Sequence, residues 1–273
     1  MPKTESFYSS AEDATSQEFL AKGYVIRDVA DRAALDAIRD AFVAFAAKHL
    51  GIDVPKDPVR FLNRLHDIVP VEKLNDLRLG AYRALNAESW FRPTYFELGR
   101  PYINDLVGNE LAMQNRINLS IQMPSDRTAL LDIHADVFSG ETPYQVVQWV
   151  PLVDVAETKS MFFLEKPKSD EISARFKDFS DHGMTGLFEA VRDDLTWIKI
   201  DYGQVLIFSP NCLHGNVLND TEETRWSLNC RFTGLFTPYV SAEKSLGSFY
   251  LPITPRPVTR VGMAFRLPGG FEE

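Results

Sequence analysis

The sequence predicts a mainly β protein with helices: a jelly roll of two sheets, with N-terminal helices packed on one of them. Helical periodicity governs about residues 14–110, and alternation of polar and apolar residues governs about residues 111–237. Helices first and many short strands afterwards are typical of this layered architecture. Pro and Gly are frequent after Pro238, so residues 238–273 are expected to form an irregular extension. We expect residues 1–273 to fold as a single domain.

Local signals place the first strand and two helices. Residues 23–29, GYVIRDV, have the composition of a short strand. Asp31 is then a suitable N-cap for a helix whose apolar residues recur at helical spacing, and Gly51 marks its end. A second helix is predicted from Val71 to about Phe91. These helices carry no catalytic pattern of their own, so we expect them to pack against a sheet.

Alternation and runs of β-branched and aromatic residues indicate the later strands. In the first of them, polar residues alternate with Ile117, Leu119 and Ile121. Its polar positions are Gln114, Arg116, Asn118, Ser120 and Gln122. The further strand-like runs are LLDIHADV, YQVVQWVPLVDV, SMFFLEK, WIKIDYGQVLIFSP and TRWSLNCRFTGLF. Residues 168–192 interrupt these runs and are expected to form a helical insertion.

Composition and charge limit the kinds of partner. Apolar residues make up 45% of the chain, and the formal net charge is −9 with an isoelectric point of about 5.1. Such an acidic protein is not expected to bind nucleic acid or a membrane, which favours a small-molecule substrate and leaves a homo-oligomer open. The two cysteines, Cys212 and Cys230, indicate a reducing compartment, and no secretory or membrane-spanning pattern is present. A cytoplasmic location is therefore expected.

Three residues have the chemistry and order of a metal site. His134 and Asp136 are two apart in a strand-like run, so both side chains can face one point. His214 follows 80 residues after His134, shortly beyond the run GQVLIFSP. Two imidazoles and one carboxylate can hold non-haem Fe(II) on one face and leave the opposite face open. A His-x-Asp triplet alone is a weak signal, and a hydrogen-bonded structural histidine is the alternative for each His taken singly.

A strand with one polar face follows His214. Arg225 stands eleven residues after His214 and begins this face. The next residues on the face are Ser227, Asn229, Arg231 and Thr233. Arginine is suited to binding a carboxylate through two hydrogen bonds, so this strand predicts a cavity for an anionic ligand. A strand with one solvated face is the alternative explanation of the alternation.

These motifs together resemble the phytanoyl-CoA hydroxylase-like branch of the Fe(II)/2-oxoglutarate-dependent dioxygenases. The resemblance covers most of the chain and is carried by FLAKGYVIRDV, HADVFSG, VVQWVPLVDV, GQVLIFSPNCLHGNVLN and TRWSLNCRF. Within that branch the chain looks most like oxygenases of bacterial surface-carbohydrate biosynthesis clusters. The resemblance implies a double-stranded β-helix, a cupin-like fold, in which His134, Asp136 and His214 bind Fe(II).

The resemblance also implies an activity and a co-substrate. Arg225 occupies the position that binds the distal carboxylate of 2-oxoglutarate in the family, and Ser227 completes an R-x-S triplet seen in some relatives. The implied reaction uses 2-oxoglutarate and O2, releases succinate and CO2, and hydroxylates an unactivated C–H bond. Desaturation and epimerisation use the same kind of site.

Further side chains are candidates for contact with these small molecules. Asn118 and Gln122 are expected to touch the co-substrate or substrate, and Arg116, Trp149 and Arg231 to touch the substrate. Arg231 lies six residues beyond Arg225, roughly 20 Å at strand rise, so the compact co-substrate cannot bridge both. Arg231 is therefore expected to hold a structural carboxylate or a distant part of the substrate. Ordinary core packing is the alternative for Trp149.

One segment departs from the family pattern and bears on the substrate. After VPLVDV, relatives usually carry an NGP…PGSH stretch, whereas this chain has AETKSMFFLEKPKS. Because that loop often borders the substrate, the substrates of better-known relatives are not transferred to this chain. A sugar, sugar nucleotide or related surface-glycan precursor is expected from family likeness alone. A cupin-type metalloenzyme that does not use 2-oxoglutarate and a catalytically inactive carbohydrate-binding jelly roll are the alternative functions.

Overall fold

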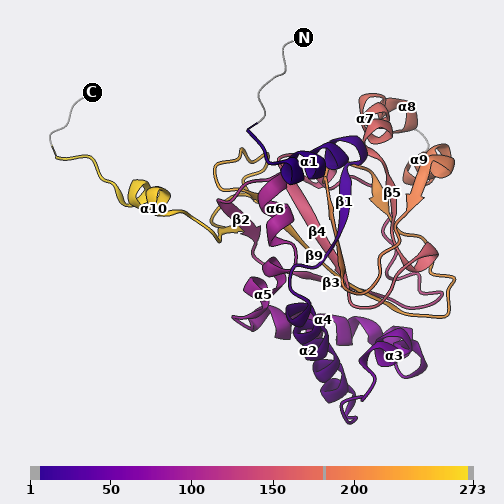
Figure 1. Ribbon diagram of the computed structural model, residues 1–273. Coiled ribbons are helices and arrows are strands. Elements are labelled where there is room, and N and C mark those ends of the chain that lie inside the picture. The colour runs from indigo at the N-terminus through magenta and orange to yellow at the C-terminus, as the bar shows by residue number, and fades with distance from the viewer. Residues whose placement is uncertain (1–6, 181–182, 270–273) are drawn as a thin grey trace.

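Two antiparallel sheets form the centre of the protein. The computed structural model describes residues 7–180 and 183–269 (Figure 1). The larger sheet has the strand order β1-β7-β4-β9-β2-β10, and β3 also pairs with β9. Its strands are β1 (Tyr24–Asp28), β2 (Leu111–Gln114), β3 (Asn118–Gln122), β4 (Gln145–Pro151), β7 (Gln204–Phe208), β9 (Arg225–Gly234) and β10 (Tyr250–Pro252). The smaller sheet has the order β6-β5-β8 and consists of β5 (Phe162–Leu164), β6 (Leu195–Trp197) and β8 (His214–Gly215).

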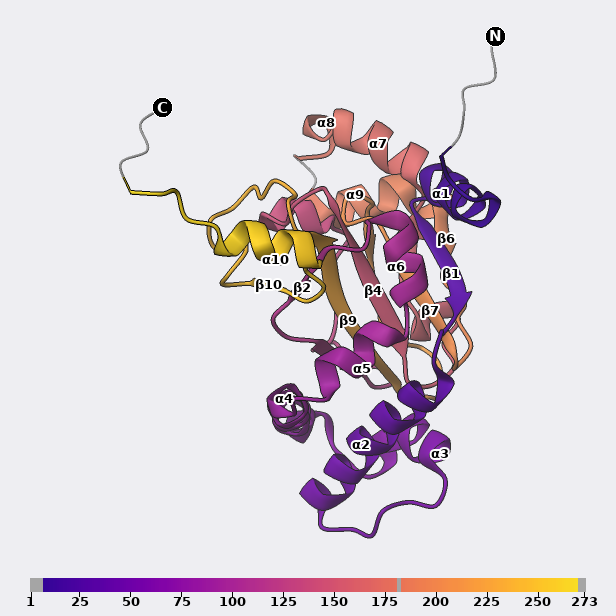
Figure 2. The ribbon, with the colours of Figure 1, turned by 60° about the vertical axis from the view of Figure 1, so that its left-hand side comes forward.

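Helices from the first part of the chain cover one face of the larger sheet. They are α1 (Ser10–Lys22), α2 (Arg32–Leu50), α3 (Pro58–Asn63), α4 (Val71–Ala87), α5 (Phe91–Glu97) and α6 (Arg100–Leu106). Figure 2 shows α5 and α6 lying across this sheet, with α2, α3 and α4 gathered toward one end of the molecule. Phe42 of α2 packs against Trp226 of β9, with ring centroids 6.4 Å apart. The buried Tyr95 hydroxyl of α5 donates to the Gln148 carbonyl of β4 at 2.8 Å, which ties helix to sheet.

Local signals fix the ends of α2, as predicted. The Asp31 side chain accepts a hydrogen bond from the backbone N–H of Ala34 at 2.9 Å. Gly51 ends the helix with a φ of 69°, a left-handed conformation that favours glycine. The second predicted helix is also present, but α4 ends at Ala87 and α5 starts as a separate helix at Phe91.

The helical insertion between the later strands is confirmed. It consists of α7 (Lys166–Ala174), α8 (Lys177–Ser180) and α9 (Gly183–Val191). Its buried Ile172, Leu187 and Val191 pack in a second apolar cluster together with Phe162 of the smaller sheet. The insertion therefore covers the smaller sheet.

The register of three strands brings their polar faces together. Asn118 of β3 lies opposite Asn229 of β9, and Ser120 lies opposite Ser227. On the other side of β9, Trp149 of β4 also lies opposite Asn229. Since side chains of directly opposed residues point to the same face of a sheet, these residues share one face of the larger sheet.

One expectation about the strands needs correction. The strand predicted from Gln114 to Gln122 is broken, because β2 ends at Gln114 and β3 begins at Asn118. In the gap, Asn86 of α4 bonds both backbone groups of Ile117, accepting from its N–H at 2.8 Å and donating to its carbonyl at 2.9 Å. The helix thus satisfies the groups that a continuous strand would have used.

The tail that was expected to be irregular contains regular structure. Strand β10 pairs antiparallel with β2, with Tyr250 opposite Gln114. Helix α10 (Pro257–Ala264) follows, with Pro257 in its first turn, where proline is well tolerated. Figures 1 and 2 show that α10 lies to one side of the sheets.

Within the described ranges, no helix has an apolar stretch long enough to cross a membrane. Cys212 and Cys230 are both buried and free.

Candidate metal centre

The two candidate histidines are neighbours across a short antiparallel bridge. The backbone N–H of His134 donates to the carbonyl of His214 at 2.9 Å, and the reverse bond has the same length. Their imidazole rings therefore lie side by side, with centroids 4.4 Å apart. Asp136 comes from the start of the 3-10 helix Asp136–Ser139, and not from a strand as predicted. Ala135 is extended between them, with φ −112° and ψ 138°, which keeps Asp136 on the side of His134.

The backbone fixes the orientation of both imidazoles. Nδ1 of His134 lies 2.8 Å from the carbonyl oxygen of Asp132, and Nδ1 of His214 lies 3.0 Å from that of Cys212. A carbonyl only accepts, so each Nδ1 carries the proton in the neutral ring. Each Nε2 is then left with a lone pair, which is the arrangement that metal-binding histidines use.

The donor atoms are spaced for one metal ion. Oδ1 of Asp136 lies 3.6 Å from Nε2 of His134 and 4.0 Å from Nε2 of His214. One donor atom from each residue falls within 4.8 Å of the other two. Two ligands at right angles, each ~2.1 Å from an ion, are ~3 Å apart, so a small side-chain movement completes the set. Two nitrogen donors and one carboxylate oxygen fit a facial non-haem iron site.

Local electrostatics prepare two of the three ligands for binding. Burial lowers the pKa of His214 to about 4, so this ring is neutral near pH 7. Burial would raise the pKa of Asp136, but the hydrogen bond with His134 and the charge of Arg231 outweigh it and hold the pKa well below its usual range. Burial would also lower the pKa of His134, but the neighbouring Asp136 carboxylate and Asp132 carbonyl raise it overall. A metal ion must therefore displace a proton from His134 at lower pH.

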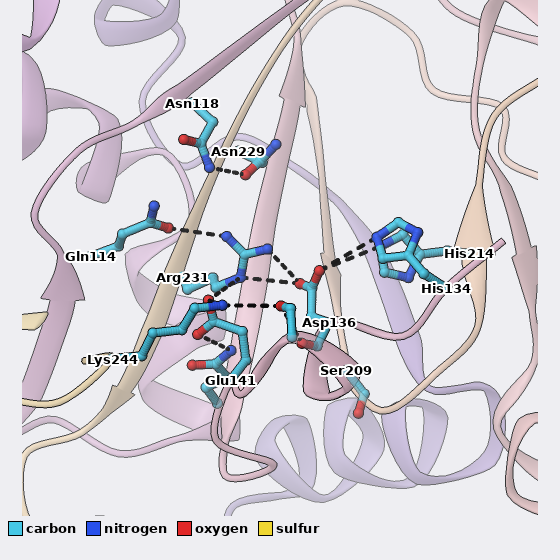
Figure 3. Close-up of polar contacts among 12 residues, drawn as sticks. Gln114, Asn118, His134, Asp136, Glu141, Ser209, His214, Asn229, Arg231 and Lys244 are labelled. Carbon is cyan, nitrogen blue, oxygen red and sulfur yellow. Dashed lines mark hydrogen bonds and ion pairs between the residues drawn. The ribbon is translucent and has the colours of Figure 1, made fainter. Parts of the chain in front are cut away.

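Arg231 lies directly against the carboxylate of Asp136 (Figure 3). Its Nη2 and Nε lie 2.9 Å and 3.1 Å from Oδ2 of Asp136. Its Nη1 donates to Oε1 of Gln114 at 3.3 Å. The structure thus places a carboxylate of the protein against Arg231, one of the two partners considered for it from the sequence.

A cavity of about 1210 Å³ opens beside the three candidate ligands. The candidate residues that line it are Asn118, Trp149, Arg225, Ser227 and Arg231, together with His134, Asp136 and His214. Ser120 and Asn229 of the same sheet face also line it. A hydrogen bond of 2.9 Å from Nδ2 of Asn118 to Oδ1 of Asn229 links two strands of this wall. The polar face of β3 and β9 is thus the wall of a cavity and not a solvated surface.

Arg225 is a buried guanidinium without a carboxylate partner among the described residues. It is 5% exposed, and its Nη1 and Nη2 donate to the carbonyl of Ser160 and to Oγ of Ser120, each at 3.2 Å. Its Nε has no hydrogen-bond partner within the described ranges. Burial lowers the pKa of Arg225 to about 10, which leaves it charged near pH 7. Since Ser120 lies opposite Ser227, the guanidinium reaches along β9 toward the level of Ser227.

Two of the predicted contact residues lie elsewhere. Arg116 falls in the gap between β2 and β3, its side chain is exposed, and it does not line the cavity. Gln122 is fully buried outside the cavity, where its Nε2 donates to the carbonyl of Val217 at 2.7 Å. The interruption of the strand explains the first error, because the alternation that placed Arg116 on the polar face does not continue through residues 115–117.

The outer wall of the cavity was not predicted from the sequence. One side of α4 lines it, including Asn75, Arg78 and Tyr82, and so does the loop of residues 128–131. Nη2 of Arg78 donates to Oδ1 of Asn75 at 2.7 Å, so these two side chains form one polar unit. Polar residues one turn apart on a helix are common on solvated surfaces, so no sequence signal distinguishes this pair.

Comparison with known proteins identifies the fold. No protein-family model and no curated protein matches the chain. Among solved structures, the nickel complex of ThoJ, described as a non-heme monooxygenase, is 16% identical over 88% of this chain and 83% of that chain, with a TM-score of 0.56. The apo form of ThoJ is 14% identical with the same coverage and a TM-score of 0.57. EvdMO1 is 13% identical over 82% of this chain and 50% of that chain, with a TM-score of 0.51. The chain therefore has the fold of the non-heme monooxygenase ThoJ.

Proposed function

We propose that the protein is an Fe(II)- and 2-oxoglutarate-dependent oxygenase that oxidises a C–H bond of a small molecule. The observation that carries this proposal is a buried Arg225, with no carboxylate partner among the described residues, in the same cavity as His134, Asp136 and His214. A buried charge without a counter-ion is costly, so its presence favours an anionic ligand that binds there. The family resemblance, with its double-stranded β-helix, supplies the same assignment independently.

Each part of the cavity has a task in this proposal. His134, Asp136 and His214 hold the iron, which when bound supplies the oxygen chemistry. Arg225 binds the distal carboxylate of 2-oxoglutarate, and Ser227, on the same face, adds a hydroxyl donor whose buried oxygen has no partner among residues 7–180 and 183–269. Asn118 and Asn229 present the remaining atoms of their amides beside the co-substrate or substrate.

The same cavity supports a polar substrate, for which we retain the sugar or surface-glycan precursor. Its amide and hydroxyl groups, including those of Asn118, Asn229 and Ser120, can bond several substrate hydroxyls. The indole of Trp149 adds a flat apolar surface to the lining. Hydroxylation is the outcome we propose, while desaturation and epimerisation place the same demands on these residues.

The alternatives differ in what they require of Arg225 and the ligands. A cupin-type metalloenzyme without 2-oxoglutarate needs the three metal ligands but gives Arg225 no anion to bind. An inactive carbohydrate-binding jelly roll needs neither, yet the imidazoles and the carboxylate are oriented for a metal.

The proposal is tested by the turnover of 2-oxoglutarate. Purified protein with Fe(II) and O2 is expected to release succinate slowly without substrate and faster when a substrate from a library of sugars and sugar derivatives is present. Arg225→Ala should lose this turnover, and Arg116→Ala should keep it, because Arg116 lies outside the cavity. Absence of succinate from the parent protein under all these conditions would favour the cupin alternative if metal binds, and the inactive alternative if it does not.

A further inference from the structure

We infer that Arg231 restricts Asp136 to coordination through one oxygen, and that Glu141 and the C-terminal extension keep Arg231 in place for this task. The inference rests on the proposed metal site. It assigns a positioning role to a chain of charged side chains, shown in Figure 3, that runs from Asp136 away from the cavity.

The two oxygens of Asp136 have different surroundings. Oδ2 is occupied by two donors of Arg231, at 2.9 Å and 3.1 Å, whereas Oδ1 faces Nε2 of both His134 and His214. A carboxylate can bind a metal through one oxygen or through both. Since Oδ2 is already bonded, only Oδ1 is available to the metal.

The number of open coordination positions depends on this restriction. An octahedral ion with three protein donors keeps three positions free. Chelation by 2-oxoglutarate takes two of them, and one must stay open for the reaction. Coordination through both oxygens of Asp136 would remove that last position. Arg231 therefore keeps one coordination position of the metal open for the reaction, in addition to holding Asp136 in place.

Arg231 is itself held by a second buried carboxylate. Oε1 of Glu141, which is 2% exposed, lies 3.7 Å from Nε of Arg231 and 3.0 Å from Nζ of Lys244. Its Oε2 accepts from the Tyr250 hydroxyl at 2.6 Å and from Nε2 of Gln145 at 3.3 Å. Positive and negative charges thus alternate from Asp136 to Lys244, which is how charges of this kind are tolerated away from water.

The C-terminal extension, residues 238–273, supplies the last member of this series of charged side chains. Lys244 lies in the loop before β10, and Tyr250 begins β10. Lys244 also donates to Oγ of Ser139 at 3.0 Å, and that hydroxyl donates to the backbone carbonyl of Asp136 at 2.8 Å. The extension therefore contacts the Asp136 segment by two routes, one through side-chain charges and one through the 3-10 helix.

Removal of Lys244 provides the sharpest perturbation. Without the ammonium of Lys244, the Glu141 carboxylate loses one of its two cationic neighbours and lies only 3.7 Å from Arg231, so the guanidinium should move toward Glu141 and away from Oδ2 of Asp136. A double variant, Lys244→Met with Glu141→Gln, also removes the competing carboxylate, so it should return Arg231 to Asp136. Lys199→Met is a matched control, because Lys199 is exposed and lies outside this chain of charges.

The experiment measures the water molecules bound to Mn(II) by the relaxation rate of water protons. With Mn(II) alone as the probe, Arg231→Met and Lys244→Met should each lower the relaxivity per bound ion, by about one third if one of three bound waters is lost. The double variant and Lys199→Met should match the parent. Retention of the parent's relaxivity by Arg231→Met or Lys244→Met with Mn(II) bound would overturn the inference.

His214→Ala separates this outcome from failure of the proposed function. If the parent binds Mn(II) no better than His214→Ala does, the metal site is wrong and the proposed function fails with it. If the parent binds Mn(II) through the site and only the relaxivity comparison fails, the inference about Arg231 is wrong and the proposed function stands. Should Arg231→Met not fold, Lys244→Met and its double variant decide the question by themselves.

Discussion

Replacement of Arg225 by methionine should separate the stability of the fold from the binding of the co-substrate. The charge of Arg225 is buried with no counter-ion in the part of the chain that the structure describes, and burial lowers its pKa from 12.5 to about 10. Near pH 7 the group is charged in the folded and the unfolded chain, so the whole cost of burial is present. At about 1.4 kcal/mol for each pKa unit, that cost is about 3 kcal/mol.

The net effect on the ligand-free protein is smaller, because Arg225 also makes two hydrogen bonds. Each contributes about 1 kcal/mol, which leaves a gain of about 1 kcal/mol for Arg225→Met. Calorimetry without ligands should therefore show a Tm that is equal to the parent's or about 2–4 °C higher. The affinity of Arg225→Met for 2-oxoglutarate should instead be lower than the parent's. Loss of a partner from a buried charge pair costs about 2–5 kcal/mol, or at least about 30-fold in the dissociation constant.

The assay is titration of 2-oxoglutarate into Mn(II)-loaded protein, with Arg225→Lys as the matched variant. Lysine should recover part of the affinity, since it restores the charge but not the two-pronged geometry. Mn(II) affinity itself should stay near the parent value. If Arg225→Met binds 2-oxoglutarate as tightly as the parent does, Arg225 does not bind the co-substrate.

Three further predictions concern the metal and the helices. His214→Ala should abolish tight Fe(II) binding and turnover, whereas Arg116→Ala should retain both; near-parental activity of His214→Ala would remove the ligand assignment. Because the pKa of His134 is raised and only the neutral ring binds metal, Mn(II) affinity should fall about tenfold for each pH unit below that pKa and level off above it, as followed by titration at several pH values; a flat profile down to pH 5 would contradict this. Asp31→Ala should lower the free energy of unfolding in urea by about 1 kcal/mol through loss of the α2 cap, and no measurable change would mean that the cap is replaced by water.

The features that could be predicted from the sequence depend on near neighbours in the chain. Asp31 and Gly51 mark the ends of α2 because a helix cap involves only residues three or four apart. The alternation from Arg225 to Thr233 predicts a strand with two unlike faces, and β9 has them. His134 and Asp136 come together because one extended residue separates them.

The features that could not be predicted depend on distant partners. The break at Ile117 follows from two hydrogen bonds with Asn86, which is 31 residues away and belongs to a helix. The alternation of polar residues therefore continues in the sequence through a point where the strand stops, and it misplaced Arg116. Strand β10 is similarly invisible in a Pro-rich tail, because its formation depends on the free edge of β2.

The position of Arg231 along its strand could be predicted from the sequence, but its contacts could not. Distance along β9 predicts a role for Arg231 different from that of Arg225, since strand rise alone fixes the spacing between them. Its contact with Asp136 depends on the turn into the 3-10 helix, and its support by Glu141 and Lys244 depends on the path of the C-terminal extension. Neither path has a local signature in the sequence.

We propose that one cavity holds a metal on His134, Asp136 and His214 and 2-oxoglutarate on Arg225. The most direct measurement is a crystal structure of the protein with Mn(II) and 2-oxoglutarate, prepared without oxygen. We expect anomalous density for one Mn(II) ion bound by Nε2 of both histidines and Oδ1 of Asp136, with the distal carboxylate of 2-oxoglutarate on the Arg225 guanidinium. Mn(II) bound elsewhere, or 2-oxoglutarate bound away from Arg225, would contradict it.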